Sequence, residues 1–144
     1  MASGLYGVTF LNALKNDLAL DLDDTTADRF KIMLVTSGYT PDFGAHDFKA
    51  DVTNEVSGTG YTAGGESLTS VTLTQASGVI TFDAADVTWT SSTITARAAV
   101  IYDDSLASDP LICYIDFGSD QSSSSGDFPI SFNASGIFTL DLTP

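Results

Sequence analysis

Alternating apolar and polar residues run through the C-terminal half of the chain. Val71 and Leu73 alternate with threonines, and Val87 and Trp89 do the same. A period of two with turn residues at short intervals is typical of strands in a β-sandwich. The predicted strands therefore cover residues 71–74, 79–82, 87–90, 93–102 (the longest), 111–117, 128–132 and 138–142.

Two details of these strands can be predicted from side-chain type. Leu111, Cys113, Ile115 and Phe117 occupy alternate positions, so we expect them to share one face of their strand, with the neighbouring acidic residue on the other. Pro129 cannot donate a ladder hydrogen bond. Its strand should therefore lie at a sheet edge or begin at a bulge.

An apolar run at residues 29–36 predicts a further, buried strand. The segment 37–51 that follows contains glycine and proline breakers and reads as a long connection. Tyr39, Phe43 and Phe48 are expected to anchor this connection to the core. His46 has no cysteine or second histidine near it, which favours a surface or capping role over a zinc site.

The N-terminal residues 5–20 predict the one helix of any length. Leu11, Leu14 and Leu18 stand at i, i+3 and i+7 and form an apolar stripe, and Thr9 is a candidate N-cap. Such a helix either covers a sheet of its own domain or docks into a neighbouring subunit. The pattern alone leaves both alternatives open.

The length of 144 residues fits a single domain, which at this size buries about 70% of its unfolded surface. We divide it into a helical arm with an acidic linker, residues 1–28, and a strand-rich body, residues 29–144. The predicted fold is mostly β, a jelly-roll-like β-sandwich with one N-terminal α-helix.

The charge balance is strongly acidic, with 19 Asp and Glu against 5 Lys and Arg and a formal net charge of −14. Phosphate backbones and anionic membranes both attract basic proteins, so we expect neither as a partner. The acidic linker at residues 21–28 lacks the glycine and distal glutamate of an EF-hand, which favours a solvated loop over calcium. No apolar run approaches the ~20 residues of a membrane span, and residues 1–7 do not resemble a signal peptide.

The sequence offers no convincing catalytic group, and we expect no enzyme, cofactor or metal. A Ser-His-Asp triad would have to use His46, and no nucleophile elbow is present. Cys113 lies in an apolar strand pattern and is expected to be a buried structural thiol. Arg97 is flanked by apolar residues, so its guanidinium should pair with a carboxylate of its own domain or of a neighbouring subunit.

The glycine-rich stretch at residues 51–65, DVTNEVSGTGYTAGG, contains no lysine that could work with its glycines on a phosphate. We interpret Gly58, Gly60, Gly64 and Gly65 as turn residues between strands. Tyr61 is expected to hold the connection against the sandwich. The stretch is therefore interpreted as structural, with a contact surface as its other use.

Several segments together resemble a family of small virion proteins of tailed bacteriophages. They are MASGLYGVTFLNAL, FKIMLVTSGYTPDFGAHDF, NEVSGTGYTAGG, FDAADVTW, ARAAVIYDD and LICYIDFGSD, in this order. The resemblance covers nearly the whole chain. The family is similar to β-sandwich proteins encoded among phage head and minor tail genes. It implies a non-catalytic particle component, present in symmetric copies in the virion and made in the cytoplasm of the bacterial host.

Within a virion, the resemblance favours a capsid decoration or auxiliary protein, with a neck, tail or fibre accessory protein as the alternative. Its partners would be phage capsid or neck and tail proteins and further copies of itself. A host-glycan-binding module using loop aromatics such as Tyr39, Phe43 or Tyr61 is a separate alternative. The residues predicted for an interaction surface are Leu11, Leu14, Leu18, Tyr39, Phe43, Tyr61 and Arg97.

Overall fold

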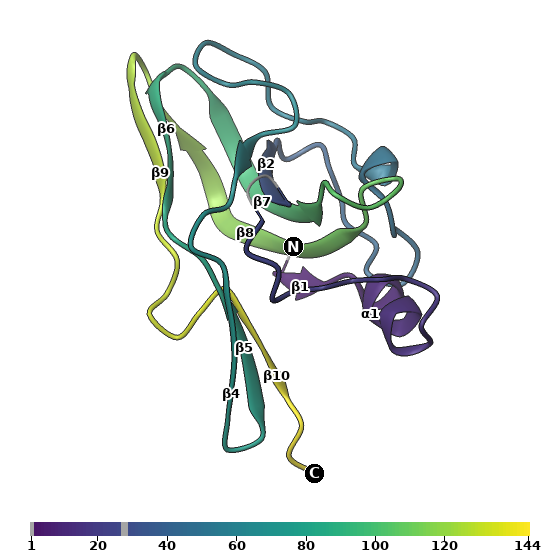
Figure 1. The fold of residues 1–144 in the computed structure, drawn as a ribbon. Coiled ribbons are helices and arrows are strands. Elements are labelled where there is room, and N and C mark those ends of the chain that lie inside the picture. Colours follow the sequence, from purple (N-terminus) through teal and green to yellow (C-terminus); the bar gives the residue numbers. More distant parts are fainter. Residues whose placement is uncertain (1, 27–28) are drawn as a thin grey trace.

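The computed structural model describes residues 2–26 and 29–144. Antiparallel strands dominate, with one short helix near the N-terminus, as the sequence predicts (Figure 1). The elements are β1 Gly4–Leu5, α1 Gly7–Leu14, β2 Phe30–Val35, the 3₁₀ helix η1 Lys49–Asp51, β3 Glu66–Ser67, β4 Thr72–Ala76, β5 Val79–Asp83, β6 Val87–Ser92, β7 Thr95–Asp103, β8 Leu111–Ser122, β9 Gly126–Ile130 and β10 Phe138–Asp141.

A five-stranded antiparallel sheet in the order β1-β8-β7-β2-β3 forms the centre of the molecule. Its strand β7 is buried at every position from Ala98 to Asp103, because both faces of the sheet are covered. Neighbouring residues of β7 therefore belong to different apolar clusters, Ile101 to one and Val100 to the other. Burial on both faces explains why the sequence of this strand is a continuous apolar run.

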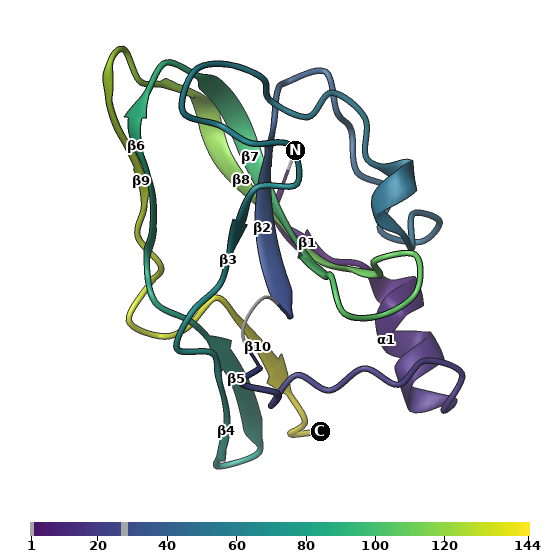
Figure 2. The same ribbon diagram turned by 45° about the horizontal axis from the view of Figure 1, so that its top comes forward.

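The first face of the central sheet packs against two smaller sheets, β6-β9 and β10-β5-β4. Trp89 and Phe128 come from the first of these and Phe82 from the second, and all three are buried with Ile101 of the central sheet. Figure 2 shows the two smaller sheets along one side, with β4, β5 and β10 extending beyond the central sheet. This sheet-on-sheet packing confirms the β-sandwich-like fold.

The second face of the central sheet is covered by α1 and by the long connection after β2. Tyr6 and Tyr39 are buried there with Tyr114 of β8, and Phe43 packs against them. The Tyr6 hydroxyl lies 2.9 Å from that of Tyr39, which in turn lies 2.9 Å from Nδ1 of His46. The prediction that aromatic residues anchor this connection is therefore confirmed for Tyr39 and Phe43, whereas Phe48 belongs to neither apolar cluster.

The predicted helix is wrong in length, and of the two alternatives left open for its leucines, Leu11 and Leu14 do not cover the sheet. It ends at Leu14, and Asn16 has a left-handed backbone (φ 63°) that stops it, so Leu18 lies outside the helix. Thr9 is not the N-cap; it is buried inside the helix and donates to the carbonyl oxygen of Leu111. Leu11 is 51% exposed and Leu14 is 88% exposed.

The core contacts of α1 are made by Thr9 and Phe10, not by the leucines. Phe10 packs edge-to-face against Phe138, with ring centroids 5.9 Å apart. Leu5, expected to begin the helix, pairs instead with β8 as part of β1. Thr9 lies opposite Leu11 on the helix, and Tyr6, just before the helix, anchors it in the second apolar cluster.

Two strand predictions also need correction. The longest strand is β8, not β7, because it continues to Ser122. Leu111 and Cys113 lie on opposite faces of the sheet, since an irregularity opposite Ile101 and Tyr102 leaves Ile112 as an extra residue. Such a bulge reverses the alternation on one side of it.

The remaining strand predictions agree with the structure to within a few residues. Pro129 lies in β9, which pairs only with β6, so the predicted edge position is confirmed. The acidic linker is a turn in which Asp24 accepts hydrogen bonds from Thr26, while Ala27 and Asp28 lie outside the described residues. Within residues 2–26 and 29–144, no helix has the length and apolar composition needed to cross a membrane.

Candidate interaction site

The described residues contain no group of three or more His, Cys, Asp or Glu side chains that could hold a metal. Cys113 is buried, as predicted, and its burial raises the pKa of the thiol to about 12. His46 Nδ1 accepts the N–H of Asp42 and faces the Tyr39 hydroxyl, which agrees with the predicted capping role. The Cys113 thiol and the His46 imidazole therefore have structural roles.

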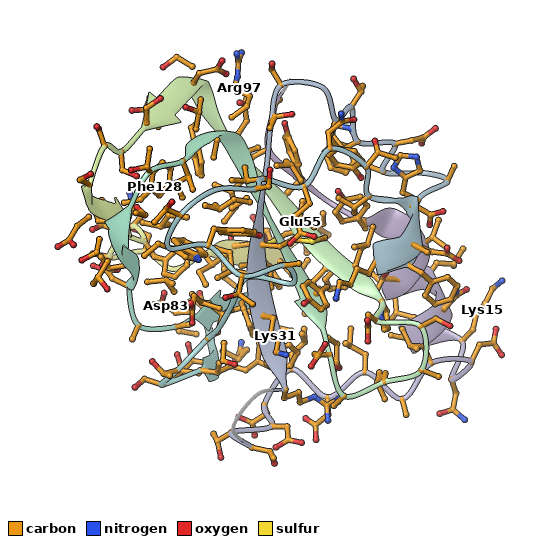
Figure 3. All side chains as sticks on the ribbon, turned by 90° about the horizontal axis from the view of Figure 1, so that it is seen from above. Lys15, Lys31, Glu55, Asp83, Arg97 and Phe128 are labelled. Carbon is orange, nitrogen blue, oxygen red and sulfur yellow. The ribbon has the colours of Figure 1, made fainter. Side chains whose placement is uncertain are left out.

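The glycine-rich stretch is organised around Tyr61, as predicted. The Tyr61 hydroxyl donates to Oε1 of Glu55 (2.8 Å) and accepts the N–H of Leu34 in the central sheet (3.0 Å). Glu55 Oε1 also accepts the N–H of Gly64 (2.6 Å), and the Tyr61 ring lies 5.9 Å from that of Trp89. Figure 3 shows Glu55 lying over the sheet in the interior of this view.

Burial and nearby negative charge act together on this tyrosine. Burial raises the pKa of Tyr61 well above its usual value, and the Glu55 carboxylate raises it further. The hydroxyl therefore keeps its proton and its donor role. Through Tyr61 and Glu55 the stretch supports β2, while its residues 57–60, 62 and 63 remain exposed and are available for a contact.

The aromatic side chains predicted for glycan binding differ in burial. Tyr39 is only 4% exposed, whereas Phe43 and Tyr61 are partly buried. Phe43 packs edge-to-face on Tyr6 with centroids 5.4 Å apart. A sugar platform needs an exposed ring face, so the glycan-binding alternative loses Tyr39 and keeps only Phe43 and Tyr61.

Arg97 pairs within its own domain, as one of its two predicted alternatives requires. Its guanidinium lies 3.4 Å from Asp116 and 3.5 Å from Asp120 on the neighbouring strand β8. At 33% exposed, it sits at the rim of the molecule (Figure 3). It neutralises acidic neighbours and leaves little charge for a partner.

Most basic side chains are engaged in the same way. Arg29 lies 2.9 Å from Asp103, and ion pairs also join Lys31 to an aspartate at 2.8 Å and Lys49 to another at 3.8 Å. Lys15, directly after α1, has no ion pair among the described residues. Its side chain points outward, away from the body of the molecule (Figure 3).

An open groove of about 540 Å³ lies between the second half of β8, strand β9 and the loop 131–137. We call it the β8–β9 groove. Its apolar lining consists of Ile115, Phe117, Phe128, Pro129, Ile130, Phe132 and Ile137, and its polar lining includes Gln121, Asp127 and Asn133. This size and composition are typical of a recognition site.

Hydrogen bonds hold the loop that closes this groove. The N–H of Phe132 donates to the carboxylate of Asp86, and the N–H of Ile137 donates to the carbonyl oxygen of Phe82. Gly136 has a φ of +99°, and a Cβ there would lie 2.5 Å from Thr81. The groove is therefore preformed, and side-chain rearrangement is not needed to open it.

The groove was not predicted from the sequence. Phe117, Phe128 and Phe132 stand at alternating positions of predicted strands, which favours core packing, but only Phe128 is buried, while the other two are partly exposed at the groove. One signal was available: residues 128–140 contain no charged side chain in a chain of net charge −14. Of the predicted surface, the structure leaves Leu11 and Leu14 exposed, and none of the predicted residues lines the groove.

Comparison of the chain with protein-family models, with curated proteins and with solved structures gives no match.

Proposed function

We propose that this protein is a non-catalytic structural component of a tailed-phage virion, a capsid decoration or auxiliary protein. The observation that carries the proposal is the pair of exposed leucines on α1, outside a core that is already closed on both faces. Neighbouring exposed apolar side chains support a contact with another protein, whereas a single exposed one needs no such explanation. The sequence resemblance supports a virion as the place of that contact.

Partners in this role are capsid proteins and further copies of the chain. The net charge of −14 supports an exposed position on a particle, because it keeps free copies apart and soluble. A neck, tail or fibre accessory protein is the alternative, and the same contact surfaces support it. Location on the particle separates the two.

The decisive experiment is cryo-EM of purified particles of the phage that encodes this chain, with mass spectrometry of the same particles. Density of this fold on the outer capsid, repeated by the shell symmetry, is the expected result. Density limited to neck or tail would reject the decoration role and keep the alternative. Absence of the protein from purified particles would overturn the proposal as a whole.

A further inference from the structure

We propose that α1 of one copy docks in the β8–β9 groove of the next, so that copies of this chain associate head to tail. Leu11 and Leu14 are the inserted side chains, and Lys15 pairs with Asp127 at the groove. This inference deepens the self-association in the proposed function and rests on it. It names the two surfaces and the residues that join them.

The first step is that both surfaces are apolar and exposed. Leu11 and Leu14 are three residues apart, so they project from neighbouring positions on the same side of the helix. The groove presents a lining of matching chemistry, including Phe117, Phe132 and Ile137. Docking removes the two leucines and the apolar lining of the groove from water at the same time.

The second step is that a molecule cannot fill its own groove. α1 and β9 lie on opposite sides of the molecule in Figures 1 and 2, and α1 is fixed there by Phe10 on Phe138. Leu14 is 88% exposed in this arrangement. The occupant has to come from outside.

The third step concerns charge and selects a second copy as the occupant. Two copies of net charge −14 repel unless they meet where charge is absent or complementary. No charged side chain occurs in residues 1–14, which supply the helix, or in residues 128–140, which supply part of the groove.

At the boundary of these neutral segments stand two opposite charges. Lys15 follows Leu14 directly and has no ion pair among the described residues, whereas Arg29, Lys31, Lys49 and Arg97 all have one. Asp127 lines the groove. Its carboxylate has no hydrogen bond or ion pair within the described part of the chain. The two charges complement each other across the proposed contact.

Because helix and groove are different surfaces, the contact is heterologous and closes into a ring when the rotation between copies permits. Discrete rings are the assembly that a symmetric particle site accommodates. An open chain would grow with concentration. Sedimentation velocity distinguishes a closed assembly from an open one.

The first test is sedimentation velocity of the full chain from about 1 μM to about 1 mM, the range of weak to moderate association. The wild-type chain should associate, and Leu14→Ser should weaken association roughly tenfold or more. Leu142→Ser is the matched control, because Leu142 is 64% exposed but lies outside both surfaces. A wild-type chain that is monomeric throughout, or equal effects of both variants, would overturn the inference.

The second test is a charge exchange. Lys15→Glu and Asp127→Lys should each weaken association roughly fivefold, and the double variant should restore it. Glu66→Lys controls for net charge, because it makes the same change as Asp127→Lys at an exposed site away from the groove. Additive losses without rescue would contradict the Lys15–Asp127 pairing.

A mixing experiment tests the head-to-tail arrangement itself. Leu14→Ser leaves a usable groove and Asp127→Lys leaves a usable helix, so each variant alone should associate more weakly than the wild-type chain by the factors given above. At a concentration at which neither variant alone associates appreciably, their mixture should form heterodimers as its main assembly. Larger mixed assemblies, or none, would reject the arrangement.

These outcomes separate the inference from the proposed function. A chain that is monomeric in solution yet found on particles keeps the virion role and rejects docking between copies. If Leu14→Ser then abolishes particle binding, the helix binds a different particle protein. Self-association of a protein absent from particles would support the docking and reject the virion role.

Discussion

The buried ion pair between Arg29 and Asp103 offers a direct test of the packing described here. Asp103 ends β7 and is fully buried, and one of its oxygens lies 2.9 Å from the Arg29 guanidinium. Its other oxygen accepts hydrogen bonds from the N–H and hydroxyl of Ser105. Arg29 is only 10% exposed and has a second partner, Asp24, at 2.9 Å.

The informative change is Asp103→Asn, which preserves shape and the acceptor for Ser105 but removes the charge. Losing one partner of a buried pair costs about 3–5 kcal/mol, because the other charge stays buried. Since Arg29 keeps Asp24, we expect a loss of about 3 kcal/mol in the free energy of unfolding, at the lower end of that range.

The adjacent residue provides the control. Asp104 lies 2.8 Å from Lys31, a similar separation, but both side chains are more than a quarter exposed. Asp104→Asn makes the same change in net charge and should cost about 1 kcal/mol or less. Urea unfolding of both variants at neutral pH measures the difference, and 1 M salt should weaken the Asp104 pair more. Equal costs for the two variants would refute the assignment of this energy to burial.

Three further predictions concern the glycine-rich stretch and the buried thiol. Gly65→Ala should lower the free energy of unfolding, measured in urea, by about 3 kcal/mol, because its Cβ would overlap the backbone of β2. The control Gly118→Ala has nearly the same φ but open space around the Cβ, and should lower it by only about 1 kcal/mol. Similar losses for the two variants would contradict the overlap. Tyr61→Phe should lower the free energy of unfolding by about 1–3 kcal/mol, because the Leu34 N–H and the Glu55 carboxylate lose a hydrogen-bond partner. The control is Tyr114→Phe, which should be nearly neutral because the Tyr114 hydroxyl has no hydrogen bond among the described residues. Thermal unfolding measures both variants. Cys113, with its pKa raised to about 12, should resist a disulfide reagent at pH 8 until urea unfolds the chain, since the thiolate is the reactive form. Rapid reaction of the folded protein would show an accessible thiol.

The strands were predictable because their signal is local. Val87 and Trp89 of β6, for example, show which positions of a strand point to the core from their own spacing. The continuous apolar run at residues 29–36 likewise predicted a buried strand, which is β2.

The direction of α1 was not predictable in the same way. Thr9 lies on the side of the helix opposite Leu11, and Phe10 and Leu14 are neighbours between these two sides, so the pattern is compatible with more than one inward direction. Tertiary contacts set the direction, because Tyr6, just before the helix, completes the cluster with Tyr39 and Phe10 meets Phe138. Those partners are distant in the sequence, so the helical pattern contains no information about them.

By itself, the sequence determined the mostly β content, the edge position of Pro129, the structural role of Tyr61 and the acidic surface. Each follows from a residue and its near neighbours, or from composition. Only the tertiary structure decided which apolar side chains remain exposed, and where β8, β9 and the loop 131–137 meet to form the groove. The physical reason is register. A bulge at Ile112 and the pairing of separate sheets set which face each distant side chain occupies, and local periodicity cannot encode that choice.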